Sequence, residues 1–374
     1  RCAMWNSTVG IRAGWLSFGG NPIIARQTWA ARGLPGTRWL GRYGMPGVLM
    51  CGFVLLLGIS AARAGEVAYF RIATGAADGT YFPIGSLIAS AISNPPGSRD
   101  CADGGSCGVP GLIAVGRASK GSVQNVTLIA GGMVESGLSQ ADIAYMAYFG
   151  LGPFKGEAQF DGLRVVATLY PELVQLAVRK HSGIFAVEDL RDRRVSLGVE
   201  GSGTAVDADA IMAAHGLTAG SYKALHYDLG EAADRLRLGK LDAFFIIGGT
   251  PVPAMADLAE QTNITLLPIH GPAASRLRRD YPFFAPAKLP AGVYRNVAET
   301  QTLSVGAQWL VSDRLDAKLV YEMTRALWHP STRRILDNGH PDGRLIQLNS
   351  ALDGVGIPLH EGARRYYEEV GALP

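Results

Sequence analysis

The residues best suited to chemistry lie in glycine-rich loops that also carry hydroxyl groups. Residues 201–204, Gly-Ser-Gly-Thr, precede an apolar pattern typical of a helix that ends near residue 215. A helix that begins there offers backbone N–H groups that attract a carboxylate or a phosphate. Capping of the helix by a serine or threonine hydroxyl explains the same residues equally well. Residues 79–81, Gly-Thr-Tyr, form a similar polar loop earlier in the chain.

A second set of polar residues lies between these two loops in the sequence. Gln140 and Asp142 shortly precede Tyr145 in a segment with few other polar side chains. These residues could contact a ligand, or Asp142 could cap a helix whose tyrosines pack in the core. The sequence leaves both interpretations open. If the ligand is an anion, Arg71 and Lys120 are the nearest cationic candidates.

The sequence lacks the usual signatures of catalysis and of metal binding. It has no His-Glu-x-x-His, no Gly-x-x-x-x-Gly-Lys-Ser/Thr and no Gly-x-Gly-x-x-Gly that opens a helix. Residues 104–108 match Gly-x-Ser-x-Gly, but without the strand and helix that a nucleophile elbow needs. Asp207 and Asp209 stand two apart on an expected helix and therefore face different directions. We expect no catalysis, no metal and no cofactor.

The charge distribution excludes a nucleic-acid partner. The whole chain carries a net charge of +3, but the seven arginines of residues 1–64, which include no acidic residue, leave residues 65–374 with −4. No run of Lys or Arg interrupts this mildly acidic body, so it has no electrostatic footprint for a phosphate backbone.

The N-terminal segment has the pattern of an export signal. Residues 48–59 form an apolar run too short to span a bilayer comfortably. Arg38 and Arg42 precede this run, and Ala62-Arg63-Ala64 follows it. This order predicts a secretory signal peptide within a leader of residues 1–64, cleaved after Ala64, and a periplasmic mature protein. A buried helix, a membrane anchor and an organellar transit peptide are the alternatives.

Cysteine usage agrees with export. Outside the leader the only cysteines are Cys101 and Cys107, in a loop rich in glycine and proline. In an exported protein such a pair predicts a disulfide. Two free thiols are the alternative, and a metal site is disfavoured because no histidine or further cysteine stands nearby in the sequence.

Strand-like and helix-like segments alternate along the body. We expect strands at 69–73, 112–115, 164–169, 173–178, 194–197, 243–247 and 264–267. We expect helices from Pro83, from Ser122, from residue 201 to about 215, and over 317–328. The alternation predicts an α/β fold, and about 310 residues favour two lobes. Ligands of such sheets bind at the loops that follow the strands.

Taken in order, these segments resemble the TAXI family of TRAP-transporter solute receptors. The resemblance covers about residues 66–374 and rests on the ordered set 73–85, 121–125, 136–145, 169–172, 195–204, 241–249, 267–269, 281–283, 290–294 and 357–360. Two departures are Glu200, where proline is common, and Ser139, where an apolar residue is common.

The resemblance implies a two-lobed, type II periplasmic-binding-protein-like fold with the ligand cleft between the lobes. Lobe one would comprise residues 66–170 and 302–374, and lobe two residues 171–301. The implied partners are a small carboxylate or amino acid resembling glutamate or glutamine, and a TRAP membrane permease, commonly with fused small and large subunits. The candidate ligand-binding residues are Thr74, Gly75, Gly79, Thr80, Tyr81, Ser122, Asn125, Gln140, Asp142, Tyr145, Ser202, Gly203, Thr204 and Gly248.

Two other functions fit the same sequence. A sensory subunit would bind the same solute and dock on a membrane kinase, and a neighbouring kinase gene rather than a permease gene would favour it. An enzyme on this fold is the other alternative. Export and the missing nucleophile–base set argue against an enzyme.

Processing of the leader is directly testable. We expect the exported protein to begin at Gly65, because Ala62 and Ala64 provide the small residues that a signal peptidase recognises. N-terminal sequencing of the periplasmic fraction checks this. Recovery of the protein in membranes with residues 45–64 still attached would contradict the prediction.

Overall fold

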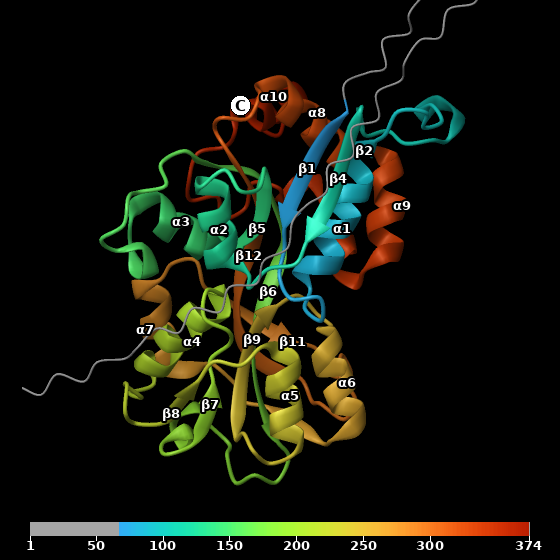
Figure 1. Ribbon diagram of the computed structural model, residues 1–374. Coiled ribbons are helices and arrows are strands. Elements are labelled where there is room, and N and C mark those ends of the chain that lie inside the picture. Colours follow the sequence, from blue (N-terminus) through green and yellow to red (C-terminus); the bar gives the residue numbers. More distant parts are fainter. Residues whose placement is uncertain (1–66, 374) are drawn as a thin grey trace, which may run out of the picture. The chain divides into compact units, whose positions relative to one another are not determined.

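Two long antiparallel strands run through the centre of the structure and join its two lobes (Figure 1). The computed structural model describes residues 67–373. Strand β6 (Leu163–Arg179) pairs with β12 (Thr300–Ser312) from Leu163 opposite Ser312 to Leu173 opposite Ser304. The chain passes from one lobe to the other along β6 and returns along β12.

Lobe one places three parallel strands beside this pair. Strand β1 (Ala68–Ala73) lies between β4 (Leu112–Arg117) and β5 (Ser136–Gln140), and β5 pairs with β12. The lobe's helices are α1 (Tyr81–Ile92), α2 (Ser122–Ala130), α3 (Ala141–Phe149), α8 (Ala317–Leu327), α9 (Pro330–Gly339) and α10 (Glu361–Glu369). A short pair, β2 (Ser93–Asn94) and β3 (Val109–Pro110), closes the loop that holds the cysteines.

Lobe two continues the same sheet on the other side of β6. Strand β9 (Ala243–Gly248) pairs with β6, and β7 (Arg194–Ser196) and β8 (Lys223–Leu225) follow in parallel. Strands β10 (Ile264–Leu266) and β11 (Ala285–Leu289) pair with β6 and β12. The lobe's helices are α4 (Gly203–Ala214), α5 (Leu229–Arg237), α6 (Pro253–Gln261) and α7 (Gly271–Asp280).

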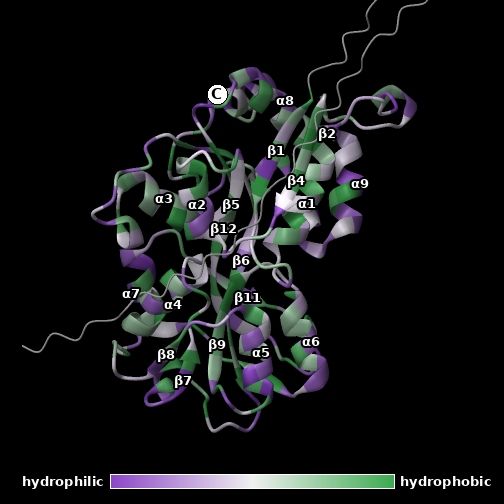
Figure 2. Ribbon diagram, viewed as in Figure 1, coloured by the Kyte–Doolittle hydropathy of each residue, from purple (hydrophilic) through white to green (hydrophobic). Residues whose placement is uncertain are grey.

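The apolar core is divided mainly by lobe. In lobe one, the fully buried Trp309 and Tyr367 pack with Phe70 and with apolar residues of α1 and α8. In lobe two, Phe244 and Phe245 on successive positions of β9 point to opposite faces of the sheet and join two separate clusters. Figure 2 shows hydrophobic residues along the central strands and hydrophilic ones over much of the helices and loops. Each lobe therefore has apolar packing of its own.

One expected pair of strands is a single strand in the structure. The sequence predicts separate strands at 164–169 and 173–178, interrupted at Pro171, but β6 is continuous. Pro171 lies opposite Gly306, and the register of β12 shifts between Ala307 and Gln308. This irregularity accommodates a residue that has no N–H to donate. None of the described helices has the length and apolarity needed to cross a membrane.

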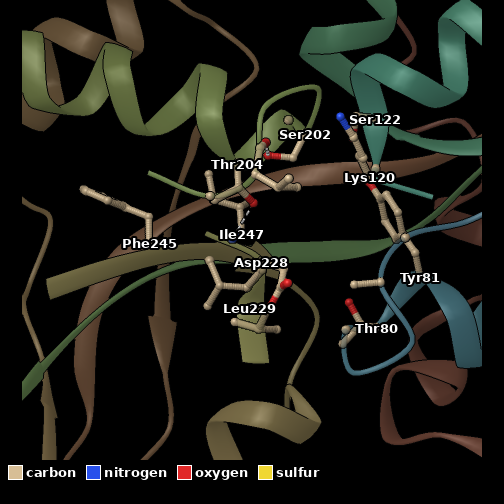
Figure 3. A pocket seen from close by; sticks show the side chains of 18 of the residues that line it. Thr80, Tyr81, Lys120, Ser122, Ser202, Thr204, Asp228, Leu229, Phe245 and Ile247 are labelled. Carbon is tan, nitrogen blue, oxygen red and sulfur yellow. Dashed lines mark hydrogen bonds between the residues drawn. The ribbon is translucent and has the colours of Figure 1, made fainter. Parts of the chain in front are cut away.

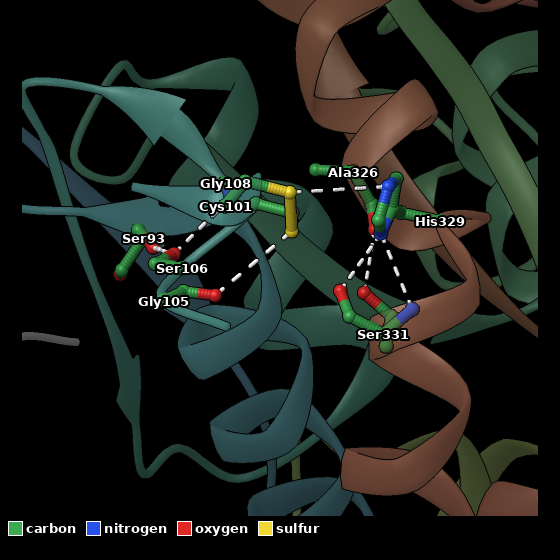
Figure 4. Close-up of a disulfide and its surroundings, with 10 residues drawn as sticks. Ser93, Cys101, Gly105, Ser106, Gly108, Ala326, His329 and Ser331 are labelled. Carbon is green, nitrogen blue, oxygen red and sulfur yellow. Dashed lines mark hydrogen bonds between the residues drawn. A yellow bond between two sulfur atoms is a disulfide. The ribbon is translucent and has the colours of Figure 1, made fainter. Parts of the chain in front are cut away.

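The expected disulfide between Cys101 and Cys107 is present in lobe one (Figure 4). No histidine stands near these cysteines in the sequence, but in the structure the Nε2 atom of His329 is 4.0 Å from the Cys101 sulfur. His329 belongs to the α8–α9 connection, more than two hundred residues further along the chain. Its Nδ1 atom accepts from the backbone N–H of Ser331 and caps α9.

Removal of this disulfide should cost stability without changing the ligand site. The bridge closes a loop with a sequence separation of 6, and the chain-entropy relation gives about 2 kcal/mol for so short a loop. The double variant Cys101→Ala with Cys107→Ala should therefore melt a few degrees lower in calorimetry. An unchanged melting temperature would show that the bridge does not constrain the unfolded chain.

Candidate ligand-binding site

A cavity of about 100 Å³ lies between the lobes, at the carboxyl ends of their parallel strands (Figure 3). Loops that follow β1, β4, β5, β7, β8 and β9 all reach it, as expected for an α/β sheet. Its lining from lobe one and the crossing strand comprises Gly75, Ala76, Gly79, Thr80, Tyr81, Lys120, Gly121, Ser122, Gln140 and Glu172. Its lining from lobe two comprises Gly198, Val199, Ser202, Gly203, Thr204, Tyr227, Asp228, Leu229, Ala232, Phe245, Ile246, Ile247 and Val252.

The lobe-one wall is a connected set of polar side chains. Tyr81, the first residue of α1, places its Oη atom 3.5 Å from Oγ of Ser122. The Ser122 hydroxyl, at the start of α2, accepts from the backbone N–H of Gln140 and lies 3.3 Å from its Oε1 atom. Three elements that are distant in sequence thus hold one another in place, which keeps this wall rigid.

The start of α4 forms the facing wall. The Ser202 hydroxyl accepts from the backbone N–H of Ala205 and donates to the carbonyl of Val199. Thr204 Oγ1 accepts from the backbone N–H of Ile247 on β9. Capping is therefore the correct interpretation of the Ser202 hydroxyl, and both hydroxyls are tied into lobe two. What α4 presents to the cavity is the positive end of its helix dipole, with Gly203 at the first position.

The two walls are in contact, so the structure is a closed form. The side-chain amide of Gln140 donates to Asp207 of α4 over 2.7 Å, and both groups are buried. The backbone N–H of Gln124 donates to the carbonyl of Gly201. On the opposite side of the cavity, Thr80 Oγ1 accepts from the backbone N–H of Gly249. These three hydrogen bonds join segments that belong to different lobes.

A buried acid stands at the base of the cavity. Glu172 lies on β6 where the strand passes between the lobes, and its side chain accepts a 2.6 Å hydrogen bond from the Tyr81 hydroxyl. Burial raises the pKa of Glu172 well above its ordinary value, and the carboxyls of Asp142 and Asp342 raise it further, against the hydrogen bond from Tyr81. The pKa of the Tyr81 hydroxyl is also raised, first by burial and then by Glu172.

Nine of the fourteen candidate residues line the cavity, and the other five lie outside its lining. Asn125 donates to the carbonyls of Thr74 and Leu138, and the Thr74 hydroxyl donates to the carbonyl of Arg117, so this pair shapes the loops. Tyr145 packs against aromatic rings of Phe149 and Phe283. Asp142 is buried beside the Asp207 carboxyl, and Gly248 ends β9 beside Thr80.

Sequence reasoning did not single out Tyr227, Asp228 or Glu172, which line the cavity. Of the two cationic candidates, Lys120 lines the cavity, whereas Arg71 is bound to Glu135 at 2.6 Å. Tyr227 and Asp228 come from the loop before α5, which carried no motif. Glu172 falls in the motif range 169–172, where the sequence gives it no role of its own. The sequence did contain a signal for Glu172, because an acidic residue inside a long apolar strand needs a hydrogen-bond or charge partner.

Comparison with known families gives the class of the protein. A family described as the NMT1-like family matches residues 72–371. The chain belongs to the NMT1-like family. This family is of the periplasmic-binding-protein type, so the two-lobed α/β fold class expected from the sequence is confirmed. This family type is that of solute-binding proteins, and the cavity between the lobes is the candidate site for a solute.

Solved structures with a related chain path are distant in sequence. The periplasmic aliphatic sulphonate binding protein SsuA from Escherichia coli is 13% identical over 82% of this chain and 79% of that chain, with a TM-score of 0.41. PhnD1 from Prochlorococcus marinus (MIT 9301), in complex with methylphosphonate, is 10% identical over 82% and 99%, with a TM-score of 0.48. XAC2383 from Xanthomonas citri, bound to ATP, is 12% identical over 81% and 96%, with a TM-score of 0.44.

The protonation of Glu172 should be visible in stability. A carboxyl whose pKa is raised by folding stabilises the fold fully below its unfolded pKa, and loses that contribution as the pH rises through the folded pKa. Glu172→Gln keeps a neutral acceptor for Tyr81 at every pH. We expect the free energy of unfolding to fall less steeply with pH in the variant, by up to about 1.4 kcal/mol per pH unit.

Urea titrations between pH 5 and pH 8 measure this difference. Glu157→Gln, at an exposed position of a lobe-one loop, is the matched control and should follow the wild type. If the wild type and Glu172→Gln show parallel pH dependence, Glu172 does not hold a proton in the folded protein.

Proposed function

We propose that this protein is the extracytoplasmic solute receptor of a TRAP-type secondary transporter of the TAXI class. It captures a small carboxylate or amino acid resembling glutamate or glutamine and delivers it to a TRAP membrane permease. Its family and the ordered motifs over residues 66–374 support this proposal. Residues 66–170 with 302–374 act as one lobe and 171–301 as the other. The leader that directs export lies outside the described residues.

The observation that carries the proposal is the distribution of charge around the closed cavity. The N-terminus of α4 and the Lys120 ammonium offer positive potential to a carboxylate. From other parts of the lining, Asp228 offers carboxyl oxygens to an ammonium group, and Glu172, which its raised pKa keeps protonated, offers a neutral carbonyl oxygen. Phe245, Ile247 and their neighbours supply apolar surface between these poles. An amino acid with a short carbon chain matches this arrangement.

In this proposal the site binds a solute and catalyses no reaction. A nucleophilic hydroxyl needs a base within hydrogen-bond reach. The lobe-two hydroxyls of the lining are instead committed to backbone partners, Ser202 to α4 and Thr204 to β9. The Tyr81 hydroxyl donates to a carboxyl whose proton affinity is itself raised.

A set of matched ligands tests this assignment. L-glutamate and L-glutamine should raise the melting temperature of the mature protein. Glutarate, which lacks the ammonium group, and 4-aminobutyrate, which lacks the α-carboxylate, should raise it much less. A ligand with a dissociation constant near 1 μM, at hundredfold excess over that constant, stabilises the fold by about 2.7 kcal/mol, which is a shift of several degrees at most. Shifts produced only by cations or apolar compounds would contradict the proposal.

The variant Gly203→Ala tests whether closure holds the ligand. A Cβ atom at this position would lie 1.4 Å from Gln140 Oε1 and 2.9 Å from Ser122 Oγ, both across the cavity in lobe one. Lobe two alone tolerates the change, because alanine favours the helix start. Closure must then displace Gln140 and break its hydrogen bond to Asp207. We expect L-glutamate to bind about tenfold to hundredfold more weakly by calorimetry.

The matched control is Gly131→Ala at the end of α2, where the nearest atom to a new Cβ is 3.3 Å away within the same segment. It should bind L-glutamate as the wild type does. Equal affinity of Gly203→Ala and the wild type would mean that the solute is held without contact between these walls.

A further inference from the structure

Two buried carboxyl groups meet at the seam between the lobes, outside the lining of the solute cavity. Asp142 is the second residue of α3 in lobe one, and Asp207 is the fifth residue of α4 in lobe two. Each is 1% exposed. The two carboxyl groups lie close enough to interact directly. Neither oxygen of Asp142 has a hydrogen-bond donor among the described residues. A carboxylate has no hydrogen to donate, so a hydrogen bond between the two groups requires a proton on at least one of them.

The surroundings of the pair supply no positive charge. Asp207 accepts from the Gln140 amide, whereas neither oxygen of Asp142 has such a donor within residues 67–373. The other charged group acting on the pair is the buried Glu172 of β6, which in turn faces Tyr81 and Asp342. On the side of α7, a cavity of about 500 Å³ adjoins Asp207, and its titratable lining is Tyr145, Asp209, Asp280 and Tyr281. No Lys, Arg or His of the described residues acts on either carboxyl.

A metal ion does not fit between these two acids. Calcium takes six to eight oxygen ligands and magnesium demands six. Here only two carboxyl groups meet, and the nearest further side chain, Gln140, directs its amide nitrogen at Asp207. Within residues 67–373, the one group of side chains with metal-ligand spacing contains Cys101, Cys107 and His329, elsewhere in lobe one.

Burial therefore favours a proton, rather than a metal ion, between the Asp142 and Asp207 carboxyl groups. It raises the pKa of Asp142. It raises the pKa of Asp207 well above the ordinary value, and the neighbouring Asp142 raises it further. When the lobes separate, the two acids part and each regains water, so both effects disappear.

We propose that a proton shared by Asp142 and Asp207 fastens the two lobes together, so that the receptor closes more readily as the pH falls. The inference requires that the lobes hinge apart and does not depend on which solute is bound. It adds a proton-binding site at the lobe seam, beside the solute cavity.

The sign of the pH dependence follows from linkage. Between the ordinary pKa of aspartate in the open form and the raised pKa in the closed form, closing takes up a proton from solution. Acid therefore favours closure in this window. Above the raised pKa both acids are ionised, and bringing two carboxylates together opposes closure. For one proton taken up, the ratio of closed to open molecules changes by up to tenfold per pH unit.

Small-angle X-ray scattering of the solute-free mature protein between pH 5 and pH 9 tests this inference. The radius of gyration of the wild type should increase as the pH rises. In Asp207→Asn the amide donates to the Asp142 carboxylate permanently, so the protein should stay compact at every pH. Asp209→Asn changes an acid two positions away on α4 that interacts with Tyr222 instead, and should follow the wild type.

A wild type whose radius of gyration is constant across this range overturns the inference, and so does an Asp207→Asn variant that keeps the wild-type dependence. If Asp207→Asn does not fold, Asp142→Asn takes its place in the experiment, because it puts the amide on the other lobe. Carbon-13 NMR of aspartate carboxyls in the wild type is the second measurement, and the absence of any carboxyl that titrates above the ordinary range also overturns it. Failure of every solute in the ligand screen leaves these readouts intact, so the two proposals can fail separately.

Discussion

The antiparallel pairing of β6 with β12 is the interaction on which the rest of the structure depends. It is the connection through which the sheet of lobe one continues into that of lobe two. Strands β5 and β9 attach to either side of this pair, and their carboxyl ends place Gln140 and Gly248 at the same seam. The ladder is extensive and buried. Bending of its two strands would separate the lobes while the core of each lobe stays packed.

Four acids gather where the lobes meet, and their burial shapes the chemistry of the seam. Glu172, Asp142, Asp207 and Asp342 are each 1% exposed. Burial raises the pKa of Asp342 to about 7, against a hydrogen bond from the backbone of Thr250 in lobe two. Acids in such a place are costly unless they are neutral or paired. The energy of closing the receptor is therefore tied to protons as well as to solute.

The sequence was sufficient for the elements whose periodicity is local. The helix expected from residue 201 to about 215 is α4 at Gly203–Ala214, and the one expected at 317–328 is α8 at Ala317–Leu327. Three histidines, His329, His340 and His360, cap helices through Nδ1, and His340 and His360 are buried.

What the sequence could not supply were contacts made only when distant segments meet. Nothing near Asp207 in the chain indicates that Asp142 faces it, and the need for glycine at 203 arises from Gln140 in the other lobe. The proximity of His329 to the disulfide could not be predicted for the same reason, because the two segments are distant in sequence. Local patterns located the loops of the site, whereas the partners of each side chain depended on the closure of the two lobes.

The route of the chain through the two lobes also sets an order of assembly. The elements from β7 to β11 are contiguous in sequence, so with β6 in place lobe two can complete most of its core from neighbouring segments. Lobe one cannot, because Phe70 of β1 packs in a cluster with Trp309 of β12 and Tyr367 of α10, near the end of the chain. Contacts this distant in sequence form slowly. During synthesis, β1 can pair early with β4 and β5, but the core cluster that Phe70 joins stays incomplete until β12, α8 and α10 have formed.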